Sequence, residues 1–297
     1  MANKCVMTGA TGYIGSHVLK YLLSKGWEIH VIADPKFGYA NIEDVLSQVD
    51  VFEYDGNILS LCDYFQKVKP DVVFHLAAAV ITNYKPEQVP VLIQSNIQLG
   101  AEILEAMKSS ETKLFVSTGS YWQNYNSDTY NPVDLYAATK EAFEKIVQFY
   151  VDAYGLRHVN LRLFDVYGED DKRPKLWNAL RDIAGTDKHI AVSPGEQLLD
   201  LIHISDVCTA YEAAFFALIE DASIMNKVYG VRTGVTHSLK EAIMVLENAL
   251  GNKINVDFGA KPYKEREVMK PKSDYELLPN WSYRISLEEG FKRFKID

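Results

Sequence analysis

The chain has 297 residues, of which 47% are hydrophobic and 24% charged, a composition typical of a globular enzyme with a sizeable core. Its formal net charge of -9 argues against binding to nucleic acid, because phosphate backbones are held by clustered lysine and arginine side chains. The three cysteines lie far apart and the seven histidines lack metal-ligand spacing, so we predict neither a disulfide framework nor a metal site.

Short apolar runs alternate with segments of helical period along the first half of the chain. We predict strands at residues 5–7, 29–33, 51–54, 72–76, 114–117 and 159–163. This alternation predicts an α/β fold, namely a Rossmann-type doubly wound parallel sheet with helices on both faces. No apolar run approaches the roughly 20 residues that a membrane helix needs, so we expect a cytoplasmic protein without membrane contact.

The first predicted strand runs directly into "VMTGATGYIGSHV", which opens the first predicted helix. Glycines spaced in this way allow a tight turn, the close approach of a pyrophosphate to the main chain, and the packing of helix against strand. The sequence therefore predicts a dinucleotide-binding loop. Its expected contacts are Gly9, Thr11, Gly12, Tyr13, Ile14 and Gly15.

Asp34 ends the second predicted strand, at the distance from the glycine loop where a carboxylate accepts hydrogen bonds from the adenosine ribose. This position favours NAD(H) over NADP(H), whose 2'-phosphate a carboxylate repels. Lys36 follows two residues later and could offset that repulsion, so NADP(H) stays open. Further cofactor neighbours are expected at the ends of later strands: Asn57, Ile58, Leu76, Ala77, Ala78 and Ser117.

Tyr136 and Lys140 are four residues apart at the start of a predicted helix, so they share one helix face. An isolated phenol has a pKa of about 10, which a nearby ammonium and a ribose hydroxyl would lower. Tyr136 would then exchange a proton while Thr118, at the end of the preceding strand, hydrogen-bonds the reacting oxygen. The implied chemistry is hydride transfer between a nicotinamide and a carbinol or carbonyl carbon.

Beyond about residue 165 the alternation loosens into charged loops and separate helical stretches at 177–183, 205–218 and 287–294. We expect a smaller C-terminal lobe that is interleaved with the first domain. The expected division gives residues 1–165 and 200–226 to the Rossmann domain, and residues 166–199 and 227–297 to a lobe that binds the substrate.

Several motifs in this order resemble the extended short-chain dehydrogenase/reductases, specifically the NAD-dependent epimerase/dehydratase group that acts on nucleotide-activated sugars. The resemblance implies a nucleotide-sugar substrate, catalysis by Thr118, Tyr136 and Lys140, and a homodimer packed through helices near residues 96–108 and 136–154. The motifs are "TGATGYIGSHV", "VFHLAAAV", "FVSTGSYW", "YAATK", "LRLFDVYG", "GEQLLDLIHISDV" and "KEREVM".

The subclass rests on a few departures from the family pattern. Gly119 and Ser120 stand where the family's dehydratases carry an Asp-Glu pair, so we do not expect a 4,6-dehydratase. The loop after Thr118 is similar to that of nucleotide-sugar 4-ketoreductases of the CDP-abequose and CDP-paratose synthase type. The resemblance implies substrate contacts from Thr118, Gly119, Ser120, Tyr136, Asp165 and Arg266.

Many relatives place an arginine where this chain has Leu199, and an asparagine where it has Asp165, so positive charge for a pyrophosphate falls to Arg266 and to Arg173 or Lys175. The leading hypothesis is NAD(P)H-dependent reduction at C4 of a nucleotide-linked 4-keto-6-deoxyhexose. A 4-epimerase that retains its NAD is the second hypothesis. The third is a non-catalytic dinucleotide-sensing protein, against which the presence of both Tyr136 and Lys140 argues.

Overall fold

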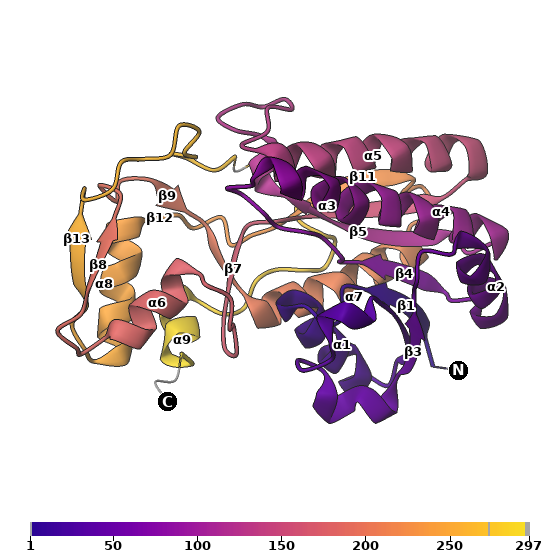
Figure 1. Ribbon diagram of the computed structural model, residues 1–297, viewed down its shortest axis with the longest axis horizontal. Coiled ribbons are helices and arrows are strands. Elements are labelled where there is room, and N and C mark those ends of the chain that lie inside the picture. The colour runs from indigo at the N-terminus through magenta and orange to yellow at the C-terminus, as the bar shows by residue number, and fades with distance from the viewer. Residues whose placement is uncertain (1, 273, 295–297) are drawn as a thin grey trace.

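A seven-stranded parallel sheet forms the centre of the molecule in the computed structural model, which describes residues 2–272 and 274–294 (Figure 1). Residue 1 of the expected Rossmann domain, and residues 273 and 295–297 of the expected smaller lobe, lie outside the described residues. The strand order is β11-β6-β5-β4-β1-β2-β3, and every neighbouring pair is parallel. The strands are β1 (Lys4–Thr8), β2 (Glu28–Ala33), β3 (Asp50–Glu53), β4 (Val72–His75), β5 (Leu114–Ser120), β6 (Arg157–Leu163) and β11 (Asn226–Val231).

The predicted parallel sheet is confirmed, but it has one strand more than the sequence predicted. Strand β11 pairs with β6 along its whole length, with Asn226 opposite His158 and Val231 opposite Leu163. The expected division assigned residues from 227 onward to the smaller lobe, and for this strand that assignment is wrong. Its sequence "NKVYGV" lacks a long apolar run, because it lies at the sheet edge and only its last three residues are buried.

Two layers of helices cover the sheet, as Figure 1 shows. Helices α1 and α7 pack against each other on one face, whereas α2, α4 and α5 pack side by side on the other. Each helix buries one apolar stripe, such as Phe143, Val147 and Val151 of α5, and leaves the opposite stripe in solvent. The helices are α1 (Tyr13–Ser24), α2 (Ile58–Val68), α3 (Val89–Ile93), α4 (Leu99–Ser109), α5 (Leu135–Tyr154) and α7 (Ile204–Glu220).

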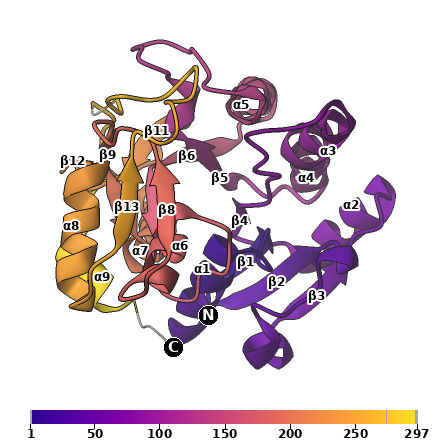
Figure 2. The same cartoon turned by 60° about the vertical axis from the view of Figure 1, so that its left-hand side comes forward.

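The remaining elements gather at one end of the sheet around a core of their own that includes Trp177, Leu246 and Phe291 (Figure 2). Three short strand pairs, β8 with β13, β9 with β12, and β7 with β10, join distant parts of the chain. The last helix, which we predicted at residues 287–294, ends at Lys292 and is therefore shorter than predicted. The elements are β7 (Asp165–Tyr167), α6 (Leu176–Ile183), β8 (His189–Val192), β9 (Leu198–Leu199), β10 (Leu201–His203), β12 (His237–Ser238), α8 (Leu239–Leu250), β13 (Asn255–Phe258) and α9 (Leu287–Lys292).

Candidate active site

The glycine loop between β1 and α1 depends on two of its three glycines for packing. Gly9 has a φ of 74°, and a Cβ atom there would lie 2.5 Å from the amide nitrogen of Ala77. A Cβ atom at Gly15 would lie 2.0 Å from the carbonyl oxygen of Gly9, so helix and loop meet without space for a side chain. A Cβ atom at Gly12 would meet nothing closer than that same oxygen, at 3.3 Å. Gly12 is therefore not required for internal packing, and it leaves the outer surface of the loop open.

Helix α1 begins at this open loop without a side chain to cap its first turn. Gly12 occupies the N-cap position, and no side chain of the described residues accepts a hydrogen bond there. The unpaired N–H groups and the positive end of the helix dipole favour an anion at this place. The loop therefore fits the pyrophosphate of a dinucleotide, with Tyr13, Ile14 and Gly15 supplying the first N–H groups of the helix.

The other expected cofactor neighbours lie at the carboxyl ends of the strands next to this loop. Asp34 caps the turn that follows β2 by accepting from the Lys36 amide at 3.1 Å, and it forms an ion pair with the Lys36 amine. Asn57 caps α2, where its Oδ1 accepts from the amide of Leu59 at 3.1 Å. The Ala77 amide donates to Thr8 Oγ1 at 3.2 Å. Asp34 and Asn57 thus hold their own loops, and their exposed edges stay open to a ligand.

Tyr136 and Lys140 lie in the first two turns of α5, which begins at Leu135 after the N-cap residue Asp134. The Asp134 side chain caps the helix by accepting from the amide of Ala137 at 2.9 Å. Both site residues are buried, with 8% of Tyr136 and 2% of Lys140 exposed. Burial raises the pKa of Tyr136 to about 12, with a further rise from Asp134, while the Ser120 side chain opposes it. The cation that lowers the pKa of Tyr136 is Arg162 and not, as we expected, Lys140, and burial outweighs its effect in the chain itself.

Lys140 shares its surroundings with a buried ion pair. Arg162 donates two hydrogen bonds to Glu144, at 2.8 and 3.1 Å, and Gln123 donates to the same carboxylate at 2.8 Å. Burial lowers the pKa of Lys140 to about 8, while Glu144 opposes the shift and Arg162 adds to it. Arg162 thus belongs to a structural ion pair beneath the site. Its contact partner Glu144 lies one helical turn beyond Lys140, so α5 carries both.

Thr118 lies near the carboxyl end of β5 and is only partly buried. Its hydroxyl donates to the His75 carbonyl at 3.1 Å and lies 2.6 Å from the hydroxyl of Tyr211. Ser117 points the other way, into the sheet, where its hydroxyl meets His158 Nε2 at 2.7 Å and Asn160 Nδ2 at 2.9 Å. The side chain of Thr118 therefore lies at the edge of the site, whereas that of Ser117 is hydrogen-bonded within the core.

Gly119 and Ser120, which follow Thr118 and were expected to contact the substrate, also have structural roles. A Cβ atom at Gly119 would lie 2.3 Å from Asn160 Oδ1, so a glycine is needed there to pack against β6. The Ser120 hydroxyl accepts from the amide of Trp122 at 3.3 Å and caps the short turn Tyr121–Gln123. Ser120 also lies close enough to the Tyr136 phenol to lower its pKa, which places it near the reacting group.

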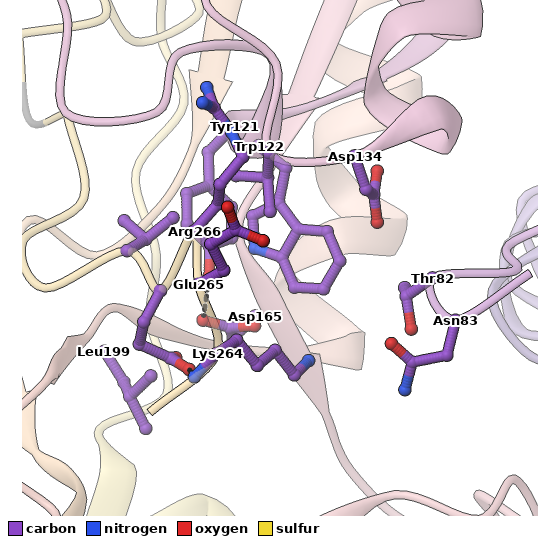
Figure 3. Close-up of a pocket in the computed structure, with 13 residues that line it drawn as sticks. Thr82, Asn83, Tyr121, Trp122, Asp134, Asp165, Leu199, Lys264, Glu265 and Arg266 are labelled. Atoms are coloured by element: carbon purple, nitrogen blue, oxygen red, sulfur yellow. Dashed lines mark hydrogen bonds between the residues drawn. The ribbon is translucent and has the colours of Figure 1, made fainter. Parts of the chain in front are cut away.

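A cavity of about 300 Å³ opens next to this turn, and Figure 3 shows the residues around it. Its volume is at the lower end of the range for small-molecule sites. The Tyr121 hydroxyl donates to Asp165 at 2.8 Å, and burial raises the pKa of that carboxyl group. The lining residues are Thr82, Asn83, Tyr121, Trp122, Val133, Asp134, Asp165, Leu199, Lys264, Glu265, Arg266, Glu267 and Val268.

The two cations that line the cavity are used differently. Arg266 donates to the carbonyl of Pro132 at 3.0 Å and to the side chain of Asn131, and its guanidinium stacks 4.3 Å from the ring of Tyr125. Figure 3 shows this guanidinium turned away from the cavity, whereas Lys264 extends across it toward Asn83. Among the described residues Lys264 makes no ion pair, and its amine lies 5.5 Å from the Trp122 ring. Of these two cations, Lys264 is thus the one that the structure leaves available to a ligand.

Of the remaining charged candidates, His203 and Arg173 are engaged elsewhere, whereas Lys175 makes no ion pair among the described residues and burial lowers its pKa. His203 is fully buried at the start of α7, where its Nδ1 accepts from the Ser205 amide at 3.2 Å and its Nε2 lies 3.1 Å from Glu169. Arg173 pairs with Asp171 at 2.6 Å and covers the ring of Tyr13 at 4.4 Å. His203 therefore has a structural role, and Arg173 lies beside the glycine loop instead of the cavity.

Comparison with known proteins agrees with this geometry. The model of the NAD dependent epimerase/dehydratase family matches residues 5–226. The chain belongs to this family. The resemblance inferred from the sequence motifs is therefore confirmed at the level of the family.

The relatives within the family have different activities. A CDP-abequose synthase of Yersinia pseudotuberculosis is 27% identical over 276 residues, which cover 93% of this chain and 94% of that protein. A UDP-glucose 4-epimerase of Halalkalibacterium halodurans is 27% identical and covers 86% of this chain and 83% of its own. The solved UDP-glucose 4-epimerase of Thermotoga maritima, with UDP-glucose, has a TM-score of 0.83 at 23% identity over 98% of this chain and 97% of that one. This likeness shows the shared fold.

The sequence reasoning missed Lys264 and Tyr211. Lys264 lies in the same short stretch as Arg266, which was expected to supply the charge-assisted contact. Only the contacts of Arg266 with residues 125, 131 and 132 show that it is already used. Tyr211 lies 93 residues beyond Thr118, in a helix whose aromatic residues follow the ordinary pattern of a buried face. No sequence signal distinguishes this tyrosine from a core residue.

Proposed function

We propose that the chain is an oxidoreductase that reduces the C4 keto group of a nucleotide-activated 4-keto-6-deoxyhexose, such as a CDP-linked sugar. The observation that supports an alcohol–ketone oxidoreductase is the buried Tyr136 phenol, with Lys140 one turn further along α5 and Thr118 near the end of β5. A phenol is protonated at neutral pH and can donate its proton to a developing alkoxide. When bound, reduced NAD(P) supplies the hydride. The CDP-abequose synthase that matches 93% of the chain agrees with the reductive assignment.

In this proposal Tyr136, Lys140 and Thr118 act together at the C4 oxygen. Tyr136 donates its proton to the oxygen, and Thr118 orients that oxygen by a hydrogen bond. Lys140, which lies one turn beyond Tyr136, holds the ribose and supplies positive charge that stabilises the phenolate after proton transfer. The glycine loop, Asp34 and the edge formed by residues 57, 58 and 76–78 hold the dinucleotide. Asp34 favours NAD(H), and its ion pair with Lys36 leaves NADP(H) as the second choice.

The cavity next to Trp122 is the proposed place of the nucleotide-sugar. Lys264 supplies a charge-assisted contact to the pyrophosphate, because it crosses the cavity without an ion pair among the described residues. From the sequence we expected Arg266 to make this contact. We now assign to Arg266 the task of holding the loop around Asn131, and to Asp165, bonded to Tyr121, a contact with sugar hydroxyls.

We assign a separate binding role to each of the two parts of the fold. The seven-stranded sheet with its helices binds the dinucleotide, and the smaller C-terminal elements bind the sugar nucleotide. A homodimer through α4 and α5 is also proposed, because α5 exposes 54% of Phe149 and 37% of Tyr154 on its outer surface.

The test is the absorbance of the reduced nicotinamide. The purified protein is mixed with NADH or NADPH and a nucleotide-linked 4-keto-6-deoxyhexose, and stoichiometric loss of absorbance is expected. Tyr136→Phe should lower kcat by about 10²- to 10⁴-fold while NADH binding persists, because the phenol hydroxyl is the proton donor. Full turnover of this variant would refute the assignment.

A 4-epimerase is the second candidate, and the relative from Halalkalibacterium halodurans together with Asp34 favours it. Such an enzyme would be purified with bound NAD, would interconvert two sugar nucleotides, and would not consume NADH. Tight binding of a dinucleotide without conversion of any sugar nucleotide would instead indicate a sensing protein.

A further inference from the structure

Tyr211 lies on α7, on the opposite side of the sheet from α5, and its side chain is fully buried. Among the described residues its hydroxyl has one hydrogen-bond partner, the hydroxyl of Thr118 at 2.6 Å. It also lies near enough to Tyr136 for ionisation of either phenol to oppose that of the other. Thr118 is thus hydrogen-bonded to the helix that carries Tyr211, and Tyr211 in turn lies within electrostatic range of Tyr136.

The direction of these hydrogen bonds follows from the number of protons. A threonine hydroxyl carries one proton, and a carbonyl oxygen can only accept. Because Thr118 donates to the His75 carbonyl at 3.1 Å, the bond of 2.6 Å to Tyr211 must be donated by the tyrosine. Thr118 then has one free lone pair and no proton to offer. A ketone oxygen has no proton either, so Thr118 must turn its own proton away from His75 to bind a keto substrate.

We propose that Tyr211 is the positioning residue that makes Thr118 a hydrogen-bond donor to the C4 carbonyl during reduction. Its donated bond keeps the Thr118 oxygen in place while the Thr118 proton rotates from the His75 carbonyl to the substrate. A hydroxyl that accepts one hydrogen bond also donates a stronger one, so the chain from Tyr211 through Thr118 polarises the ketone. Tyr211 itself does not touch the substrate. The inference rests on the proposed reductase function.

A double-mutant cycle on the full chain tests this role, with steady-state kinetics of NADH oxidation by a nucleotide-linked 4-keto-6-deoxyhexose. Tyr211→Phe removes one oxygen and should lower kcat about five- to tenfold, the range of a single neutral hydrogen bond, with KM for the sugar nearly unchanged. Thr118→Val should lower kcat further. In the Thr118→Val background Tyr211→Phe should have no additional effect, because the residue through which Tyr211 acts is gone.

Two controls separate positioning from packing. Tyr167→Phe removes another buried phenol hydroxyl, one that donates to the Ser286 carbonyl at 3.4 Å, and should leave kcat unchanged. Thr118→Ser keeps the hydroxyl and should keep the sensitivity to Tyr211→Phe. If Tyr211→Phe does not fold, as judged by its melting temperature, 3-fluorotyrosine in place of Tyr211 keeps the shape and strengthens the donor, and kcat should rise.

An unchanged kcat for Tyr211→Phe, or an equal loss in the presence and absence of the Thr118 hydroxyl, overturns the inference while the reductase assignment stands. With 3-fluorotyrosine, an unchanged or lower kcat has the same meaning. A wild-type protein that oxidises no NADH with any 4-keto sugar nucleotide overturns the proposed function, and this inference with it.

Discussion

Replacing Lys140 by methionine should make the protein more stable while it removes the proposed activity. Lys140 is 2% exposed, and burial lowers its pKa from the ordinary 10.5 to about 8. At pH 7 the folded state thus carries a charge that is disfavoured by about 3 kcal/mol relative to the unfolded chain, with the attraction of Glu144 already included, since one pKa unit corresponds to about 1.4 kcal/mol. Methionine fills a similar volume without that charge.

We expect the net gain to be smaller than this cost, because methionine replaces the packing of the buried lysine stem only in part. Glu144 keeps both hydrogen bonds from Arg162 and one from Gln123, so we expect a gain of about 1 to 3 kcal/mol for Lys140→Met. For a chain of this size that gain corresponds to a rise in melting temperature of about 2 to 5 °C. The assay is differential scanning calorimetry on protein freed of bound dinucleotide.

The sign of the pH dependence gives a sharper test. Because the pKa of Lys140 is lower in the folded state than in the unfolded state, the unfolded state binds more protons between pH 8 and 10.5. Wild-type stability therefore rises with pH in this window relative to Lys140→Met. The advantage of the variant should be full below pH 8 and should shrink as the pH approaches 10.5.

The matched control is Lys145→Met, on the same helix, where the lysine side chain is 75% exposed. Its ion pair with Glu141 is expected to contribute little, so neither the melting temperature nor its pH dependence should change appreciably. A Lys140→Met protein that melts at or below the wild-type temperature at pH 7, or an advantage that does not shrink toward pH 10.5, would refute the reasoning.

Three further predictions concern the loop, the cavity and the proposed dimer. Gly15→Ala should lower the melting temperature and abolish NADH binding, because its Cβ would overlap the Gly9 carbonyl. Gly12→Ala should melt like the wild type, yet it should bind NADH more weakly in a fluorescence titration. Lys264→Met should raise KM for the sugar nucleotide about 10- to 100-fold with a smaller effect on kcat, and an unchanged KM would exclude the proposed pyrophosphate contact. Phe149→Glu should convert a dimer to a monomer in analytical ultracentrifugation, and a persistent dimer would locate the interface elsewhere.

The sequence predicted those parts of the fold in which local pattern and tertiary structure agree. Five of the six predicted strands are largely buried in the sheet, so their apolar runs are visible without the rest of the molecule. The sixth, β3, lies at a sheet edge and has no buried residue, but Val51, Phe52 and Tyr54 still indicated a strand. Strand β11, at the other edge, escaped notice because its first two residues are polar and exposed and Gly230 interrupts its apolar run. The glycine loop was equally readable, because a Cβ at Gly9 or Gly15 is excluded by contacts within one βα unit.

The site was less readable wherever the outcome depends on contacts between distant segments. The sequence placed Tyr136 and Lys140 on one face of a helix, but the balance between burial and charge that decides their pKa values comes from β5, β6 and the turn at Ser120. Likewise, whether Lys264 or Arg266 is free depends on the loop around Asn131, more than 130 residues earlier. Motif spacing predicts which groups are present, and only packing decides which of them are already engaged.

Burial acts on Tyr136 and Lys140 in opposite directions, and this bears on the direction of the chemistry. It raises the pKa of the phenol and lowers that of the amine, so both groups are shifted toward their neutral forms. A neutral phenol next to a desolvated ammonium is poised to release its proton when an alkoxide forms beside it, since the resulting phenolate and the ammonium stabilise each other in a site of low dielectric. An enzyme that begins by removing a proton from an alcohol would need the phenolate at the start. Burial in the chain itself disfavours that phenolate, and the absorbance assay with a 4-keto sugar nucleotide decides between the two reactions.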